Sequence, residues 1–177
     1  SKRFEAPLYV EVDDTGIHTA ILSGGLPFHR RYGRRMLDTL LVVAGERCRR
    51  FQLGIGVELK NPLHDALSFV TPVPSLVQTA AAPAPVASGW LFHLDARNVT
   101  ATHWEPLFEA GANVGFRVRL LETQGRQVNV GLQSFRAVRS ARKLNFQGDQ
   151  LTECPIEKEA IRVQLTAHEW AQIEARW

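Results

Sequence analysis

The stretch FRVRLLETQGRQVNVGLQ, residues 116–133, decides the fold of this chain. Apolar side chains occupy every second position on both sides of a polar break at residues 122–126. This period of two is typical of strands that bury one face. Gly125 lies in the break and can adopt the positive φ that a tight turn often requires. We therefore predict two strands joined as a β-hairpin.

Strand patterns recur along the rest of the chain, whereas helix signals are scarce. The apolar or alternating stretches are residues 8–22, 37–43, 51–59, 90–97 and 161–165. The first of these stretches predicts a hairpin, and the second and third predict a pair of strands. Together they predict an all-β protein built as an antiparallel β-sandwich.

Residues 166–174 fit either a helix or a strand. Thr166 and Glu169 match the capping box that starts many helices. Ile173, Ala175 and Trp177 lie two residues apart, which suits a last strand that closes the sheet. The local pattern leaves both interpretations open.

Length and composition indicate a packed soluble domain. Hydrophobic residues make up 45% of the chain and charged residues 22%, values that argue against a disordered or fibrous protein. Residues 71–88 are rich in proline and alanine, which disfavours a central strand or an uninterrupted helix. We interpret them as a loop crossing a single domain, residues 1–177. A division into 1–70 and 89–177 is the alternative.

The sequence predicts no membrane partner, because no apolar run reaches the roughly 18 residues of a membrane span. The start at Ser1 without a methionine suggests that sequence upstream has been cut away. Cys48 and Cys154 belong to no Cys-x-x-Cys pair, which disfavours a zinc ribbon. Free buried thiols in a cytoplasmic protein are the favoured interpretation, and one disulfide is the alternative.

Three short motifs near the end of the chain occur in a characteristic order. They are Arg119-Leu120-Leu121-Glu122-Thr123-Gln124-Gly125, then Leu151-Thr152-Glu153, then Glu169 within Ala167-His168-Glu169-Trp170. Their order and spacing resemble the C-terminal β-sandwich of glycoside hydrolase family 38 α-mannosidases, bacterial type. This sequence departs from the family pattern at Leu121, where an aromatic is usual, and at Ala167-His168, where Pro-Phe is usual.

The resemblance implies a galactose mutarotase-like or glycosidase C-terminal sandwich. It also implies a parent enzyme that hydrolyses α-mannosidic bonds with retention at a zinc site in a separate, N-terminal catalytic domain. That catalytic domain would be the main partner, and residues 166–174 would form a strand. Glycoside hydrolysis generally needs two positioned carboxylates, and nothing in this sequence pairs any two. We therefore expect no catalytic residue, metal ligand or cofactor in this chain.

Four residues are candidates for carbohydrate contact. Trp104 lies beside a turn and offers an aromatic face to the C–H face of a sugar ring, although core packing is the usual role of tryptophan. His93, Asp95 and Arg97 share one face of a predicted strand. His93 and Asp95 with His103 also suggest a metal or general-base cluster, against the simpler interpretation of surface hydrogen bonds. These residues support an independent carbohydrate-binding module as the alternative function.

An arginine cluster surrounds Tyr32 in the first half of the chain. Its members are Arg30, Arg31, Arg34 and Arg35. Guanidinium groups pair with carboxylates at interfaces, so we interpret these residues as a contact surface for a neighbouring domain. A polyanion binder is a third hypothesis. No recognisable reader fold accompanies the cluster, so a nucleic-acid partner is not predicted.

Overall fold

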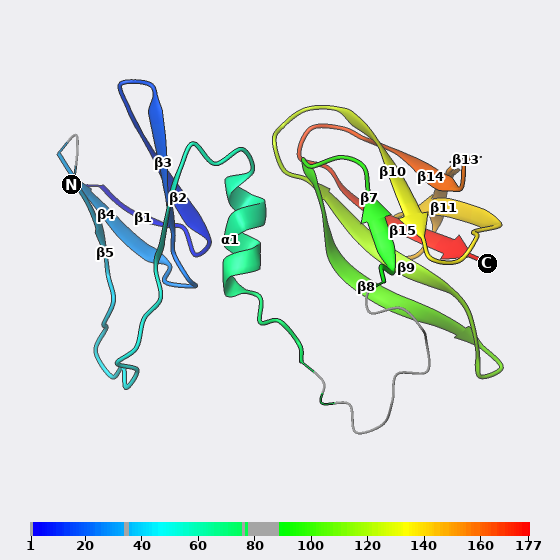
Figure 1. Ribbon diagram of the computed structural model, residues 1–177, viewed down its shortest axis with the longest axis horizontal. Helices are drawn as coiled ribbons and strands as arrows, with labels where there is room; N and C mark the ends of the chain where they lie inside the picture. Colours follow the sequence, from blue (N-terminus) through cyan, green and yellow to red (C-terminus); the bar gives the residue numbers. More distant parts are fainter. Residues whose placement is uncertain (1, 34–35, 76, 78–88) are drawn as a thin grey trace. The chain divides into compact units, whose positions relative to one another are not determined.

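The computed structural model describes residues 2–33, 36–75, 77 and 89–177 (Figure 1). The protein is mostly β, with several antiparallel sheets and one short helix. Its Cα positions form two compact units, Ser1–Gln78 and Thr79–Trp177, called unit 1 and unit 2 below. Most of the predicted connection at 71–88 lies outside the described residues, and the division into one domain or two stays a prediction.

Unit 1 holds two three-stranded antiparallel sheets and the helix. The first sheet has the order β1 (Lys2–Glu5), β4 (Phe28–Tyr32), β5 (Met36–Thr39). The second has the order β2 (Tyr9–Asp14), β3 (Ile17–Leu22), β6 (Gly54–Val57). Strands β2 and β3 form the predicted hairpin, with Gly16 in its turn at a positive φ of 84°.

The predicted pairing of residues 37–43 with 51–59 is wrong. Strand β5 pairs with β4, whereas β6 pairs with β3. Gly54 suits this pairing, because it lies opposite Leu22 and a Cβ there would meet the Leu22 side chain at 3.1 Å. The missing side chain at Gly54 therefore leaves the space that Leu22 of β3 occupies.

The helix α1 (Pro62–Val70) was not predicted from the sequence. Pro62 stands in its first turn, where the missing N–H costs no hydrogen bond. Ala66 is its buried residue, and the helix lies against β2 and β3. It ends at Thr71, whose N–H donates to the Leu67 carbonyl.

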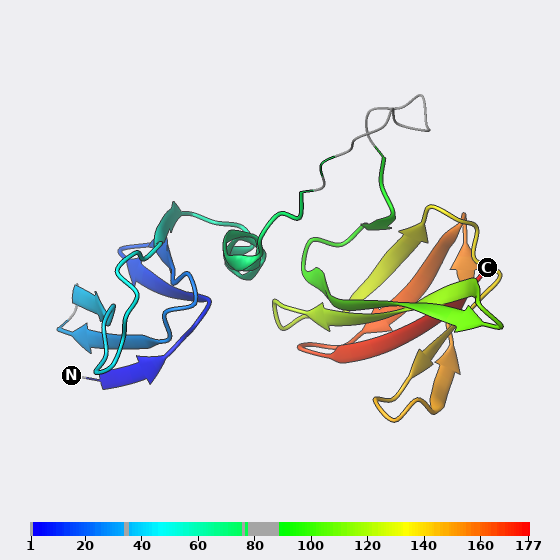
Figure 2. The same ribbon diagram turned by 90° about the horizontal axis from the view of Figure 1, so that it is seen from below.

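Unit 2 holds a four-stranded and a five-stranded antiparallel sheet. The four-stranded sheet has the order β13 (Ile156–Glu157), β14 (Ala160–Leu165), β10 (Val128–Ser134), β7 (Phe92–Leu94). The five-stranded sheet has the order β12 (Gln150–Glu153), β11 (Ser140–Leu144), β15 (Trp170–Arg176), β9 (Ala112–Glu122), β8 (Val99–Glu109). Figure 2 shows the red strand β15 running beside the light-green β9, its antiparallel partner.

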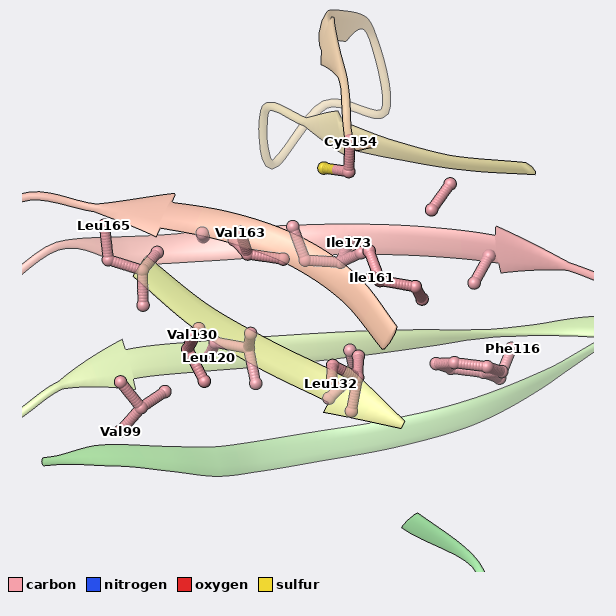
Figure 3. Close-up of a cluster of buried hydrophobic side chains, with 14 residues drawn as sticks. Val99, Phe116, Leu120, Val130, Leu132, Cys154, Ile161, Val163, Leu165 and Ile173 are labelled. Atoms are coloured by element: carbon pink, nitrogen blue, oxygen red, sulfur yellow. The ribbon is translucent and has the colours of Figure 1, made fainter. Parts of the chain in front are cut away.

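Both sheets of unit 2 contribute to one hydrophobic core (Figure 3). Val118, Leu120 and Ile173 come from the five-stranded sheet and are fully buried. The four-stranded sheet contributes fully or almost fully buried side chains at Val130, Leu132, Ile161, Val163 and Leu165. The period-two positions of the sequence are therefore the ones that pack between the sheets.

The predicted hairpin between residues 116–120 and 128–132 is also wrong. Both stretches are strands, but β9 belongs to the five-stranded sheet and β10 to the four-stranded sheet. The connecting turn, with Gly125 at a φ of 72°, carries the chain from one sheet to the other. The side chain of Glu122 holds this turn, as described below.

Residues 170–176 form the strand β15. The period-two alternation therefore predicted this segment correctly, whereas the helix suggested by the capping box is absent from it. Ala171, Ile173 and Ala175 are buried on one face of the strand. Thr166 and Glu169 do form the local contact that the capping box predicts, because the Thr166 N–H donates to Glu169 Oε2 at 2.7 Å. That contact closes a turn before the strand instead of starting a helix.

Candidate functional site

Glu122, in the first of the three motifs, is a fully buried carboxylate at the end of β9. Its oxygens accept hydrogen bonds from the side-chain amide of Asn98 (2.8 Å) and from the backbone N–H groups of Gln124, Gly125, Arg126 and His168 (2.9, 2.8, 3.1 and 3.0 Å). Burial opposes the charge, but these donors outweigh burial and lower the pKa of Glu122 to about 2.

Glu122 joins two of the motifs that lie far apart in the sequence. Its side chain accepts from His168, and its own N–H donates to the Glu169 carbonyl at 3.0 Å. The carboxylate is ionised and surrounded by donors, so its role is to hold two turns together. An acid or base in glycoside hydrolysis must exchange a proton with the substrate. The Glu122 carboxylate is buried and its oxygens already accept hydrogen bonds, so a substrate has no access to it.

Asn98 belongs to the triplet Asn98-Val99-Thr100, which matches the N-glycosylation pattern. The Asn98 side chain is buried and donates to Glu122. A glycan on that nitrogen would remove the hydrogen bond and could not fit in the buried site. The folded protein therefore does not accept a glycan at Asn98.

A cluster of ionic contacts covers the outer face of the five-stranded sheet. Glu174 is only 4% exposed and accepts from Arg117 at 2.8 Å and Arg142 at 2.6 Å. Burial opposes the charge of Glu174, but the two guanidinium groups prevail and lower its pKa. Arg117 continues the network to Glu105 at 2.7 Å. The charges in this network balance one another, which is typical of a structural ion network.

An aromatic pocket of about 440 Å³ opens at a different place in unit 2. Its rings come from β7, β8 and β9, from residues just after β10, and from the last residue of the chain. They are Phe92, Trp104, Phe116, Phe135 and Trp177. Phe92 stacks on Trp104 with 3.6 Å between ring centroids, and Phe116 lies 4.9 Å from Phe92. We call this group the aromatic pocket.

Polar groups line the same pocket beside the rings. The Arg136 guanidinium lies over the rings of Phe135 and Trp177, at 5.8 and 5.5 Å from their centroids. Asn113 and Glu105 also line the pocket. The side-chain oxygen of Asn113 is buried and accepts no hydrogen bond within the described residues. The pocket thus combines aromatic faces with the Arg136 donors and the Glu105 carboxylate.

The structure distributes the predicted carbohydrate-contact residues over different places. Trp104 lies in the aromatic pocket and packs against the core. Asp95 instead accepts from the Gly131 N–H at 2.6 Å and from Arg162 at 3.1 Å, on the four-stranded sheet. His93 is opposite Gln133 on the same sheet, and Arg97 is exposed. Trp104 and Asp95 therefore do not share one contact surface.

The suggested cluster of His93, Asp95 and His103 is not assembled. His103 lies in β8, 3.7 Å from Glu105. Across the described parts of the chain, no group of three or more His, Cys, Asp or Glu side chains is arranged to hold a metal ion. Among the same residues, no helix is long and apolar enough to cross a membrane.

The arginine cluster is described only in part, because Arg34 and Arg35 lie outside the described residues. Arg30 donates to Asp38 Oδ2 through Nε at 2.9 Å and through its terminal nitrogen at 2.5 Å. Arg31 lies beside it on β4, an exposed position. The charge of Arg30 is therefore neutralised within unit 1.

Both cysteines are free thiols, which agrees with the favoured interpretation over a disulfide. Cys154 is buried, and burial raises the pKa of its thiol. Cys48 is exposed, so the expectation that both thiols are buried is wrong for this residue. Its thiol donates to the Arg50 carbonyl in an open loop.

Sequence reasoning missed most of the aromatic pocket. Phe135 and Arg136 follow a strand without any motif, and Asn113 lies near the start of another. Trp177 was predicted as part of the last strand. Their meeting depends on the pairing of β9 with β15 and on how the two sheets pack, which no local pattern encodes.

The fold defines a class, a mostly-β protein of antiparallel sheets. A scan against models of known protein families finds no match for this sequence, and a search of curated proteins finds none either.

Proposed function

We propose that this chain is the non-catalytic C-terminal β-sandwich region of a glycoside hydrolase similar to the family 38 α-mannosidases. In this proposal the two sheets of unit 2 form the galactose mutarotase-like sandwich of such enzymes. The complete enzyme would hydrolyse α-mannosidic bonds at a zinc site in a separate catalytic domain. The present region would support that domain.

The observation that carries the proposal is the contact between the first and third motifs. Glu122 and the turn that contains His168 were chosen from a resemblance in sequence alone. In space they meet, through the hydrogen bond from the His168 N–H to Glu122. Motif residues that hold two turns together suit a structural region, and this supports a role in stability rather than in chemistry.

The exposed apolar side chains of unit 1 support a neighbouring domain as the partner. Ile55 is 78% exposed and Val57 60% exposed on the edge strand β6. Tyr32 and Met36, beside the arginine cluster, are also more than half exposed. Exposed apolar residues of this kind are typical of surfaces that another protein surface covers.

The gene upstream of the Ser1 codon provides the direct test. We expect an open reading frame that continues upstream and encodes a His-x-Asp metal motif. The complete product should hydrolyse 4-nitrophenyl α-D-mannopyranoside and lose activity when zinc is chelated. The 177-residue chain should be inactive toward the same substrate.

Two results would contradict the proposal. One is hydrolysis of the mannoside by the 177-residue chain itself. The other is an upstream reading frame that encodes no such metal motif.

A further inference from the structure

The aromatic pocket in unit 2 has the composition of a ligand site more than that of a closed core. Phe116 is buried, whereas Phe135 is 52% exposed and Leu91 beside it is 62% exposed. The pocket volume of about 440 Å³ lies within the range of small-molecule sites in proteins. The pocket therefore has a buried inner end at Phe116 and an open rim at Phe135 and Leu91.

The polar groups limit which ligand can fill this pocket. The side-chain oxygen of Asn113 is buried away from the pocket opening, so it is not available to a ligand. Arg136 provides N–H donors at the rim, and Glu105 provides carboxylate oxygens. A purely apolar ligand would satisfy none of these groups.

The charges in the pocket also argue for a neutral ligand. Arg136 carries one positive charge and Glu105 one negative charge, and Glu105 already bonds to Arg117. Anions and cations would each meet one like charge. A neutral ligand with one apolar face and a rim of hydroxyl groups meets aromatic faces, a donor and acceptors at once.

We propose that the aromatic pocket binds a neutral hexopyranose, with its C–H face against the exposed ring of Phe135 and its hydroxyl groups toward Glu105 and Arg136. The inference deepens the proposed function, on which the choice of carbohydrate rests in part. Trp104 supports the inner end of the pocket. Trp104 stacks on Phe92 and packs against the core, whereas Phe135 is 52% exposed.

The chain offers a matched control for the test. Phe135 and Phe146 are exposed to similar extents, 52% and 58%, and each lies under an arginine. Arg136 covers Phe135 at 5.8 Å and Arg119 covers Phe146 at 5.5 Å. Phe146 does not line the aromatic pocket. Removing either ring should have little effect on folding.

The experiment titrates the 177-residue chain with methyl α-D-mannopyranoside and follows tryptophan fluorescence and calorimetric heat. We expect saturable binding with a Kd on the order of 1 mM, as befits a single sugar ring. Phe135→Ala should weaken binding about tenfold, because it removes a stacking face. Phe146→Ala should change the Kd by less than about twofold.

A second pair of variants covers the case in which Phe135→Ala fails to fold. Arg136→Gln should weaken binding while Arg119→Gln should not, and thermal unfolding of each variant confirms that it is folded. Methyl α-D-glucopyranoside, titrated in parallel, reports whether the pocket selects one hexose.

Three outcomes would overturn the inference. They are the absence of saturable binding of either pyranoside, equal loss of binding in Phe135→Ala and Phe146→Ala, and binding of an apolar dye to the pocket without any sugar binding. None of them bears on the proposed parent enzyme, whose test is mannoside hydrolysis by the complete gene product. A supporting region need not touch the sugar.

Discussion

Unit 1 and unit 2 are built from similar antiparallel strands but differ in how they bury apolar side chains. Among the described residues, all but two of the buried apolar side chains belong to unit 2, and the two in unit 1 are Ala20 and Ala66. Unit 2 places leucine, isoleucine and valine between its two sheets. Unit 1 leaves comparable residues, such as Ile55 and Val57, in solvent.

Polar contacts partly replace the missing core in unit 1. His29 is buried and lies within hydrogen-bonding distance of Ser23 (3.2 Å), Thr39 (3.1 Å) and the Ala6 carbonyl (3.0 Å). Such bonds fix the chain but contribute only about 1 kcal/mol each. Apolar burial is the dominant stabilising term in folding. We therefore expect unit 2 to be stable by itself, and, under the proposed function, unit 1 to gain stability from a neighbouring domain.

The largest expected effect is in the core of unit 2. Ile173→Ala should destabilise the protein by about 2–5 kcal/mol, because it removes fully buried methyl groups between the two sheets. Ile55→Ala in unit 1 should change the free energy of unfolding by less than about 0.5 kcal/mol. Urea denaturation of both variants measures the difference. Equal losses of unfolding free energy in the two variants would contradict the proposed difference in stability between the units.

Glu122 provides the next largest effect. Glu122→Ala should cost about 3 kcal/mol or more, because several buried N–H groups lose their acceptor. Glu109→Gln is the control, since Glu109 forms an exposed ion pair with Arg176 and exposed pairs contribute little to stability. A loss in Glu122→Ala no greater than in the control would show that the turn does not need the carboxylate.

Acid should destabilise unit 2 through the same carboxylate. The pKa of Glu122 is about 2 in the folded protein, against 4.5 as its ordinary value. A carboxyl with a lowered folded pKa stabilises the protein above the ordinary value, and this contribution is lost as the pH falls from about 4.5 toward 2. Glu174 and Glu169, whose pKa values are also lowered, act in the same direction.

The pH effect is measured as the urea concentration at the midpoint of unfolding, at several pH values between 7 and 2.5. The unfolding signal is one that comes from unit 2. Glu122→Gln should start from a lower midpoint and lose less of it on acidification. An identical pH dependence in the native protein and this variant would remove Glu122 from the explanation.

The smallest effect is expected at the surface of unit 1. Arg30→Ala breaks the exposed ion pair with Asp38 and should cost less than about 1 kcal/mol. Raising the salt concentration should reduce even this difference. Thermal unfolding at low and high salt tests it, and a loss as large as that of Ile173→Ala would mean that the arginine cluster carries the stability of unit 1.

The sequence predicted the strands of unit 2 better than their partners. Alternation at Val118, Val130 and Val163 identifies a buried face because the side-chain period of a strand is two. The same alternation cannot say which sheet a strand joins. The turn after Glu122 resembles a hairpin locally, and the local pattern shows neither the sheet that the next strand joins nor the distant contact with His168.

Unit 1 was predicted less well for a related reason. Its apolar run at residues 40–43 is exposed and forms no strand, although the residue types favour one. The pairing of β6 depends on Gly54 fitting against Leu22, a contact between positions far apart in the sequence. The aromatic pocket, assembled from five separate segments, has no local signal at all.

Amide hydrogen exchange, measured on the 177-residue chain and on the complete gene product, tests the central contrast most directly. We predict slow exchange in β9, β10, β14 and β15 in both proteins. In unit 1, exchange in β4, β5 and β6 should be fast in the 177-residue chain and slow in the complete product, if the proposed neighbouring domain covers it. Equally slow exchange of both units in the 177-residue chain would contradict the account.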